Sequence, residues 1–355
     1  MATEASVVVL PAGGGPLVVR DIVLPAPDAH QVVVEVSATG VCHSQLGHIA
    51  AADPAKPLLL GHEAYGRVTA VGADVTHVQP GDGVFVTWIP RSAERRPTPT
   101  TVGLPDGESV TLRNVFTWGT HCVVDEQFVV KAQHDIPPAV ASIIGCAVMT
   151  GGGAVVNSAE VRPGQSVAVW GVGGVGLVSV AAARRAGASV VIAIDVADEK
   201  LALAARMGAT HLINVREEDP VARVREIAGV DETERGVDVS IDCTGRADNI
   251  AKSLAAARSG RPGSHQGGSV VIVSVIRGPI EIPGHELLNG QKRIIGCLGG
   301  SAVPDRDFAQ FVDWYLAGEL DLDALITDRY SLSDVNRAVE DLRAGKVLGR
   351  AVLEL

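Results

Sequence analysis

Residues 166–185 read S-V-A-V-W-G-V-G-G-V-G-L-V-S-V-A-A-A-R-R, and this stretch decides the fold. Its first part, residues 167–170, is a short apolar run that predicts a buried strand. Gly171, Gly173 and Gly176 follow with G-x-G-x-x-G spacing, and residues 177–185 continue with helical periodicity. A glycine-rich turn between a strand and a helix predicts a dinucleotide-binding unit.

Each glycine in this turn has a separate physical task. Gly171 permits the tight turn, Gly173 lets a pyrophosphate approach the backbone, and Gly176 lets the helix pack closely on the strand. The unpaired N–H groups at the start of the helix then face the phosphates. The candidate cofactor-binding residues in the turn are Gly171, Gly173, Gly174, Val175 and Gly176.

Asp195 ends the second apolar run, residues 190–194, and selects the cofactor. A carboxylate at this position accepts hydrogen bonds from the ribose hydroxyls of NAD and repels the 2′-phosphate of NADP. Asp198 and Glu199 add negative charge, and Lys200 lies either at the ribose edge or on a solvated helix face. The sequence therefore predicts NAD(H) as the cofactor.

The rest of the chain shows two different rhythms. In the second half, helical stretches separate six apolar runs that predict strands. These runs lie at 167–170, 190–195, 211–215, 237–242, 269–275 and 293–298. This alternation predicts an α/β fold with a doubly wound, six-stranded parallel sheet of the Rossmann type. Before about residue 130, short apolar runs separated by Gly and Pro predict a mostly β domain. Residues 90–107 have no periodicity, so we expect an exposed loop or lobe there.

Composition limits the class of protein. A length of 355 residues favours two domains. The net charge of −11 argues against nucleic acid or an anionic membrane as a partner. No apolar run has membrane-spanning length, and the first residues lack the basic and apolar regions of a secretory signal. Because the five cysteines also fit a reducing compartment, we expect a cytoplasmic protein.

Three segments outside the predicted sheet carry candidate metal ligands. They are Cys42 in G-V-C-H-S, His62 in G-H-E-A-Y-G and Cys146 in I-I-G-C-A-V-M-T-G. Two thiolates and an imidazole leave the fourth tetrahedral position of zinc open, as a catalytic site requires. Taken singly, each cysteine also fits ordinary packing, and an isolated histidine fits a core position. Spacing alone leaves both interpretations open, because the three residues are dispersed.

Five motifs resemble, in order and spacing, those of the zinc-dependent alcohol dehydrogenases of the medium-chain dehydrogenase/reductase superfamily. They are G-V-C-H-S, G-H-E-A-x-G-x-V, G-D-G-V at 81–84, G-C-x-x-x-T-G at 145–151 and the glycine turn. The resemblance covers nearly the whole chain. The resemblance implies a GroES-like catalytic domain at 1–148 and 300–355 and an NAD-binding Rossmann domain at 149–299. It also implies a homodimer or homotetramer with contacts around residues 280–300, and a substrate that meets NAD between the two domains.

The same resemblance implies the chemistry. Cys42, His62 and Cys146 would bind one catalytic zinc, and Glu63 would ligate it transiently. The activity is hydride transfer between an alcohol, bound to zinc as an alkoxide, and NAD, giving an aldehyde or ketone reversibly. Ser44 would take the substrate's proton. The remaining implied residues are His43, Thr150, Val275 and Arg350 as cofactor contacts and Trp88 and Trp118 in the substrate pocket.

The chain departs from the family pattern at four places. Between residues 83 and 130 it has only Cys122, so the four-cysteine cluster of a structural zinc is absent and we expect one zinc per chain. Gln45 replaces the aspartate that supports the histidine ligand, and a neutral amide supplies less charge. Gly47 stands at the position of the relay histidine, with His48 next to it as a substitute. Residues 258–268 lengthen a loop that we expect near the cofactor.

Two alternative functions stay open from the sequence. A dehydrogenase for a polyol or for a thiol adduct of formaldehyde would need extra cationic or polar groups, for which Arg91, Arg95 and Arg96 are candidates. A non-catalytic NAD(H)-binding protein is favoured only by Gln45 and the missing relay histidine. Trp88 and Trp118 would narrow the pocket or stack on an aromatic substrate, and ordinary core packing is the other interpretation.

Overall fold

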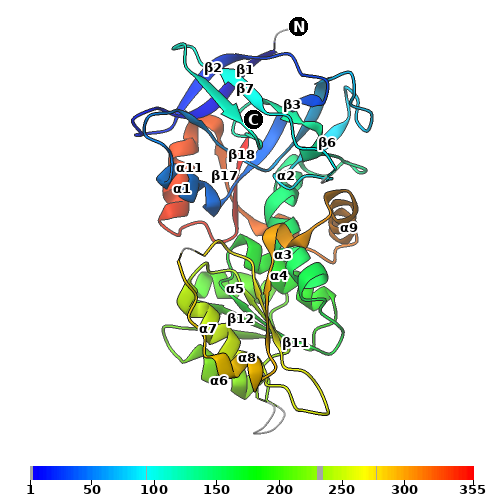
Figure 1. Ribbon diagram of the computed structural model, residues 1–355, viewed down its shortest axis with the longest axis vertical. Coiled ribbons are helices and arrows are strands. Elements are labelled where there is room, and N and C mark those ends of the chain that lie inside the picture. The colour runs from blue at the N-terminus through cyan, green and yellow to red at the C-terminus, as the bar shows by residue number, and fades with distance from the viewer. Residues whose placement is uncertain (1–2, 93, 230–234, 277) are drawn as a thin grey trace. The chain divides into compact units, whose positions relative to one another are not determined.

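The computed structural model describes residues 3–92, 94–229, 235–276 and 278–355, and the chain divides into two compact units (Figure 1). The first unit comprises Met1–Cys146, Val303–Asp313 and Leu322–Leu355, and the second comprises Ala147–Ala302 and Trp314–Asp321. Among the described residues, no helix combines the length and apolar character needed to cross a membrane.

The first unit is mostly β structure. Its strands are β1 (Thr3–Leu10), β2 (Val18–Leu24), β3 (Gln31–Val41), β4 (Leu58–Leu59), β5 (Ala64–Val71), β6 (Gly83–Val86), β7 (Thr100–Gly103), β8 (Ser109–Leu112), β9 (His121–Asp125), β10 (Val129–Lys131), β17 (Ile326–Ser331) and β18 (Arg350–Glu354). They form one sheet in the order β10-β6-β5-β3-β18-β17 with β9 also on β3, a second sheet β2-β1-β4, and the hairpin β7-β8. Because β3 pairs with β5, β9 and β18, it is buried along nearly its whole length.

Short helices flank these sheets. They are α1 (His43–Ala50), η1 (Glu126–Phe128), α2 (Pro138–Ser142), the π-helical turn η2 (Ile144–Val148), the first part of α9 (Pro304–Leu316), α10 (Leu322–Leu325), η5 (Leu332–Asp334) and α11 (Val335–Arg343). Helices α1 and α11 lie side by side and share a core cluster with strands β1, β3 and β18. This packing fixes the start of α1 against the end of β3.

The prediction of an exposed loop or lobe over residues 90–107 is incomplete, because its second half contains the half-buried strand β7. Strand β7 pairs with β8 across a turn that contains Gly107, whose φ is 88°. Thr100 and Val102 are buried while Thr101 and Gly103 are exposed, so one face of this short strand is buried. A run of four residues is too short for periodicity to reveal it.

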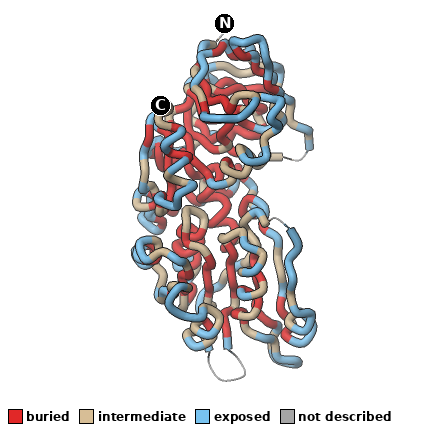
Figure 2. Tube along the Cα trace, turned by 90° about the vertical axis from the view of Figure 1, so that its left-hand side faces the viewer, coloured by how far each residue is buried: buried red, intermediate tan, exposed pale blue. Residues whose placement is uncertain are grey.

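The second unit is an α/β fold, as predicted. Its parallel strands are β11 (Ser166–Trp170), β12 (Val190–Asp195), β13 (His211–Asn214), β14 (Val239–Asp242), β15 (Ser269–Ile272) and β16 (Arg293–Gly296), in the order β13-β12-β11-β14-β15-β16. Its helices are α3 (Met149–Gly153), η3 (Ala154–Ser158), α4 (Gly174–Arg185), α5 (Asp198–Arg206), α6 (Pro220–Ile227), α7 (Ala247–Ala256), α8 (Gly284–Leu288) and η4 (Leu298–Ser301). The central strands are continuously buried (Figure 2), which fits a parallel sheet covered on both faces.

The segment Trp314–Asp321 packs with this second unit rather than with the first. The guanidinium of Arg185, in α4, lies 4.0 Å from the centre of the Trp314 ring and forms an ion pair with Glu319 at 2.7 Å. An Arg stacked on an indole adds a cation–π contact to the apolar packing. The boundary near residue 300 that we expect from the resemblance stays a prediction.

The loop at residues 258–268 lies at the amino ends of the strands, not at the cofactor edge as we expected. It connects α7 to the start of β15, and Arg258 forms an ion pair at 2.7 Å with Asp238, directly before β14. Gly260 and Gly267 hydrogen-bond to Gly290 and Gln291, which precede β16. Since dinucleotides bind at the carboxyl ends of parallel strands, this loop is remote from the expected cofactor edge.

Candidate metal centre and cofactor turn

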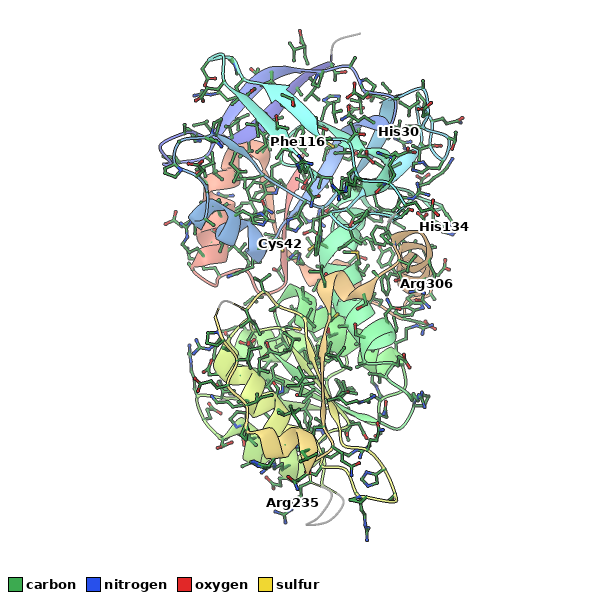
Figure 3. All side chains as sticks on the ribbon, viewed as in Figure 1. His30, Cys42, Phe116, His134, Arg235 and Arg306 are labelled. Atoms are coloured by element: carbon green, nitrogen blue, oxygen red, sulfur yellow. The ribbon has the colours of Figure 1, made fainter. Side chains whose placement is uncertain are left out.

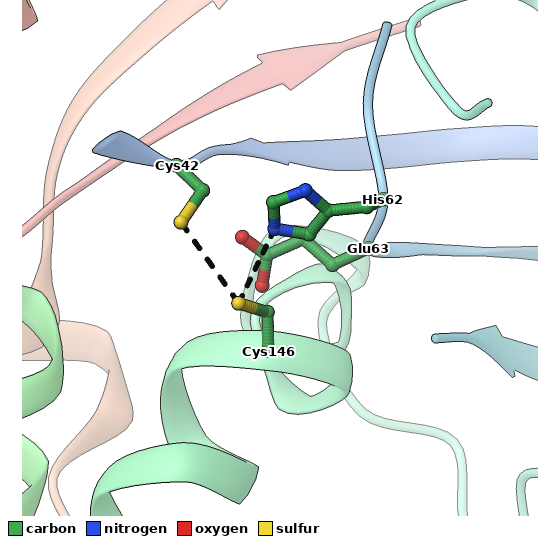
Figure 4. A group of neighbouring side chains, drawn as sticks. All are labelled: Cys42, His62, Glu63 and Cys146. Atoms are coloured by element: carbon green, nitrogen blue, oxygen red, sulfur yellow. Dashed lines mark hydrogen bonds between the residues drawn. The ribbon is translucent and has the colours of Figure 1, made fainter. Parts of the chain in front are cut away.

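Four side chains converge in the first unit: Cys42, His62, Glu63 and Cys146 (Figure 4). Their ligand atoms all lie within 4.8 Å of one another, and all but His62 are buried. Figure 3 shows Cys42 at the start of α1, among the side chains of this unit. The structure therefore brings together the three predicted zinc ligands and the predicted carboxylate.

Neighbouring strands hold these residues in place. Cys42 directly follows β3, and His62 and Glu63 directly precede β5, which pairs with β3 in the register Thr39↔Ala64. The Thr39 hydroxyl donates to the Glu63 carbonyl at 2.6 Å. Cys146 lies on the π-helical turn η2, and the carbonyl of the residue before it, Gly145, accepts from the Thr87 hydroxyl at 2.7 Å.

The distances between the ligand atoms fit a tetrahedral zinc. The two sulfurs of Cys42 and Cys146 are 3.9 Å apart, and Nε2 of His62 is 3.3 Å from the Cys146 sulfur. Tetrahedral zinc with ordinary bond lengths places two sulfurs about 3.8 Å apart, and a sulfur and a nitrogen about 3.6 Å apart. Two thiolates and an imidazole are also the ligands that zinc prefers.

The electrostatic surroundings favour a thiolate at Cys42. A hydrogen bond from Cys146 and the positive charge of Arg350 hold the pKa of the Cys42 thiol well below its ordinary value, although burial acts in the opposite direction. Burial alone raises the pKa of Cys122, elsewhere in the same unit, to about 12. Since the thiolate is the form that binds metal, Cys42 has the character of a ligand and Cys122 that of a packing residue.

Arg350 forms a buried ion pair with Glu63, a contact that the sequence did not suggest. Strand β18 pairs with β3 in the register Ala351↔Val41, and this places Arg350 beside Cys42. Glu63 is 0% exposed, so its charge needs such a partner. The guanidinium is thus engaged by a carboxylate, and its contact with a cofactor phosphate stays a prediction.

Gln45, Ser44 and His48 line the first turns of α1. The amide nitrogen of Gln45 lies 2.5 Å from Nδ1 of His62 and 3.3 Å from Nδ1 of His48, and its oxygen accepts from the Gly61 N–H at 2.9 Å. The Ser44 hydroxyl donates to the Cys42 sulfur at 3.4 Å. His48 thus contacts the residue that supports His62, and its role as a proton carrier stays a prediction.

The two tryptophans differ in their surroundings. The Trp88 ring lies 6.3 Å from the His62 ring in an edge-to-face arrangement, and its indole N–H has no partner in the described residues. Trp118 is 0% exposed, belongs to a core cluster and donates its indole N–H to the Gly40 carbonyl at 3.1 Å. Trp118 is therefore packed as a core residue, and its place in a substrate pocket stays a prediction.

The glycine turn has the geometry that a dinucleotide needs. Gly171 has φ of 81°, and a Cβ on Gly176 would lie 2.0 Å from the Gly171 carbonyl oxygen, so both positions exclude larger residues. A Cβ on Gly173 would meet nothing within 4 Å, which leaves space above the start of α4. That space lies at the unpaired N–H groups of the helix, where a phosphate is stabilised.

Asp195 lies at the end of β12, beside this turn. Its carboxylate accepts from the Val172 N–H at 2.8 Å and from the Val196 N–H at 2.7 Å. Two backbone donors orient the carboxylate and stabilise its charge. The structure therefore brings Asp195 and the glycine turn together.

The other candidate cofactor contacts differ in how far their side chains are exposed. Thr150 is only 7% exposed and its hydroxyl has no partner among the described residues, so it is available to an outside donor or acceptor. Val275 is 75% exposed. Lys200 is half-buried in α5 and His43 is exposed at the start of α1. Their contacts with a cofactor stay predictions.

Two of the three arginines considered for a polyol or a thiol adduct of formaldehyde form ion pairs with carboxylates. Arg91 pairs with both carboxylate oxygens of Asp305 at 2.5 and 2.7 Å. Arg95 pairs with both oxygens of Asp125 at 2.9 and 2.8 Å. Two carboxylates neutralise these two guanidinium groups, which leaves little charge for an additional anion.

Comparison with known proteins gives a consistent family. Residues 28–138 match the model of the alcohol dehydrogenase GroES-like domain, and residues 174–317 match the model of the zinc-binding dehydrogenases. The chain is 33% identical to S-(hydroxymethyl)glutathione dehydrogenase of Paracoccus denitrificans, over 99% of this chain and 100% of that protein.

Solved structures agree with this result. An alcohol dehydrogenase zinc-binding domain protein from Burkholderia ambifaria superposes with a TM-score of 0.88 at 29% identity, covering 100% of both chains. Benzyl alcohol dehydrogenase from Acinetobacter calcoaceticus superposes with a TM-score of 0.87 at 27% identity, covering 99% of both chains. The chain therefore belongs to the zinc-dependent alcohol dehydrogenases of the medium-chain dehydrogenase/reductase superfamily, with a GroES-like and a Rossmann fold.

Proposed function

We propose that this protein is an NAD-dependent alcohol dehydrogenase that uses one catalytic zinc per chain and converts an alcohol reversibly into an aldehyde or ketone. The observation that carries the proposal is the group Cys42, His62 and Cys146, with spacings that fit tetrahedral zinc. Three protein ligands leave one position for substrate, as in catalytic zinc sites. Residues 83–130 contain one cysteine, Cys122, so we propose no structural zinc.

Zinc, when bound, would supply Lewis-acid activation of the substrate oxygen. The charged groups of the site suit a divalent cation. The thiolates of Cys42 and Cys146 would balance its charge, and the carboxylate of Glu63 is already balanced by Arg350. Ser44 places a hydroxyl next to the Cys42 sulfur, and a hydroxyl both accepts and donates a proton. We assign to Ser44 the removal of the substrate's proton.

NAD rather than NADP is supported by Asp195. Its carboxylate is held at the end of β12 by the N–H groups of Val172 and Val196, and a fixed negative charge there opposes a 2′-phosphate. Asp198 and Glu199, in the first turn of α5, add to this negative field. Hydrogen bonds to the ribose hydroxyls are the role that we assign to Asp195.

The substrate class is supported by Trp88. Its indole lies edge-to-face with His62, and its unpartnered N–H and ring favour an alcohol with an unsaturated or aromatic group near the hydroxyl. The similarity to benzyl alcohol dehydrogenase of Acinetobacter calcoaceticus points in the same direction. A thiol adduct of formaldehyde is less favoured, because Arg91 and Arg95 are paired with carboxylates.

We further propose a cytoplasmic homodimer or homotetramer. Several apolar side chains are exposed in or next to the segment expected at the contact, namely Val275, Ile280, Leu287, Leu288 and Leu298. Exposed apolar side chains gathered in one segment are typical of subunit contacts.

A steady-state assay tests the proposed function. Purified protein is given a panel of primary alcohols, with benzyl alcohol and ethanol as the extremes, and either NAD or NADP. We expect NADH formation with a preference for benzyl alcohol and for NAD. Oxidation that is faster with NADP would contradict the role of Asp195, and no oxidation of any alcohol by zinc-loaded protein would contradict the proposed activity.

A further inference from the structure

The carboxamide of Gln45 is the support of His62, and every hydrogen-bonding group on it is used. Gln45 is 2% exposed. Its oxygen accepts from the Gly61 N–H at 2.9 Å, while its nitrogen lies 2.5 Å from Nδ1 of His62 and 3.3 Å from Nδ1 of His48. A primary amide has two N–H groups, so one is directed to each imidazole.

The backbone at Gly61 decides which way this amide points. A backbone N–H only donates, so the oxygen of Gln45 must face Gly61 and the nitrogen must face His62. Since the amide nitrogen only donates as well, Nδ1 of His62 must accept. A neutral imidazole that accepts at Nδ1 carries its proton on Nε2, and here Nε2 lies 3.3 Å from the Cys146 sulfur. Without metal, this sulfur accepts that N–H.

The arrangement conflicts with the binding of a metal through Nε2. An imidazole that binds metal at Nε2 carries its proton on Nδ1 and donates it to an acceptor. The amide N–H of Gln45 then faces the Nδ1–H of His62, and the two nitrogen atoms are 2.5 Å apart. If the amide turns over, its oxygen accepts from His62, but its NH2 group then faces the Gly61 N–H. Either orientation leaves one buried donor without an acceptor, which costs free energy.

We propose that Gln45 is a positioning residue that stabilises the metal-free centre, with the proton of His62 on Nε2, and thereby weakens zinc binding. His48 assists by accepting the second amide N–H, which holds the amide in that orientation. A carboxylate in the same place would accept from both Gly61 and His62 and would remove the conflict. The inference rests on the zinc site of the proposed function.

The affinity for zinc tests this inference on the full chain. We would compare wild type, Gln45→Glu and Gln45→Met by competition with a chromogenic chelator, after thermal unfolding has shown that each variant is folded. Gln45→Glu keeps the length of the side chain and replaces the donor by an acceptor. We expect its zinc dissociation constant to be lower by about tenfold to a hundredfold.

Gln45→Met distinguishes a residue that weakens zinc binding from one that supports the zinc-bound form of His62. It keeps a side chain of similar length but removes the donor that opposes Nδ1–H, so we expect zinc binding at least as tight as in wild type. If Gln45 instead supports the metal-bound histidine, Gln45→Met binds zinc more weakly, and the inference is wrong. Equal affinity in wild type and Gln45→Glu would also overturn it.

The proton on His62 is measured separately in the metal-free protein. Long-range ¹H–¹⁵N correlation of ¹⁵N-histidine-labelled protein reports which ring nitrogen is protonated, and the His62 signal is assigned by its loss in His62→Gln. We expect Nε2–H in wild type and Nδ1–H in Gln45→Glu. A proton on Nδ1 in wild type contradicts the inference. Failure of every form to bind zinc overturns the proposed metal centre as well, whereas equal zinc binding overturns the inference alone.

Discussion

The turn at Gly171 and the centre around Cys146 differ in the length of chain that builds them. The glycine turn and Asp195 belong to one strand–helix–strand unit, and hydrogen bonds within that unit join them. In the metal centre, Cys42 and Cys146 are 104 residues apart in the sequence. Arg350 and Glu63, which form an ion pair, are 287 residues apart. The first region is encoded locally, and the second depends on the pairing of β3 with β5 and β18.

The two regions also treat buried ionisable groups in opposite ways. At the metal centre, neighbours lower the pKa of Cys42 and favour its charged form. Near the glycine turn, burial raises the pKa of Asp242 to about 6, and hydrogen bonds from Thr244 and Gly245 only partly offset this effect. Cys42 has the positive charge of Arg350 nearby, whereas burial is the largest effect on Asp242 and opposes its charged form.

The largest expected effect comes from removing one ligand of the metal centre. Cys146→Ala should lower kcat/KM for alcohol oxidation by about a thousandfold, because the Lewis acid contributes several kcal/mol to the stabilisation of the transition state. Cys122→Ala is the matched control, since Cys122 is equally buried in the same unit. It should keep activity and lower the free energy of unfolding by about 1 kcal/mol. Similar activity in both variants would remove the distinction between the two cysteines.

The next effect concerns Asp242, at the carboxyl end of β14. Between about pH 4 and pH 6 the folded protein keeps this proton while the unfolded chain has lost it. The stabilisation is therefore complete below about pH 4 and is lost as pH rises through 6, by about 3 kcal/mol. Urea unfolding of wild type and Asp242→Asn at pH 4 and pH 7 isolates this term, since Asn does not titrate. The wild type should lose about 3 kcal/mol relative to the variant, and a constant difference would contradict the burial argument.

Substitutions in the glycine turn separate stability from cofactor binding. Gly176→Ala should lower the free energy of unfolding by about 2 kcal/mol, because the new Cβ meets the Gly171 carbonyl oxygen at 2.0 Å. Gly173→Ala should leave stability unchanged within about 0.5 kcal/mol, since that position is open. It should nevertheless weaken NADH binding about tenfold by occupying the space for the pyrophosphate. Thermal unfolding and NADH fluorescence titration measure the two effects, and equal loss of stability in both variants would refute this division.

The smallest expected effect is on the choice of cofactor. Asp195→Ala should shift the ratio of kcat/KM for NAD and NADP about tenfold towards NADP, because one repulsive charge and its ribose hydrogen bonds are lost. Arg206→Ala, on the same α/β unit, is a control that should not change the ratio. If the ratio of kcat/KM for NAD and NADP is unchanged in Asp195→Ala, the carboxylate does not bind the ribose hydroxyls.

The difference between the regions explains what the sequence could predict. All six strands of the parallel sheet and the three glycine positions follow from local periodicity, and the structure confirms that α/β fold. The loop at 258–268 was misplaced, although its position between α7 and β15 would have put it at the amino ends of the strands. The order of helix and strand along the chain was therefore sufficient to place this loop correctly.

The metal centre was accessible only through family motifs. Spacing could not distinguish Cys146 from a packing cysteine, because its partners come from remote strands. The ion pair of Arg350 with Glu63 had no local signal, since it depends on the register of β18 against β3. For Trp118 the sequence left core packing and a pocket role open, and the structure places its side chain in a core cluster.

Zinc per chain, measured by elemental analysis on protein purified without added metal and again after zinc loading and gel filtration, tests the central claim most directly. We predict one zinc per chain after loading in wild type and Cys122→Ala, and none in Cys146→Ala. No zinc in loaded wild type, or one zinc retained by Cys146→Ala, would contradict a centre built from Cys42, His62 and Cys146.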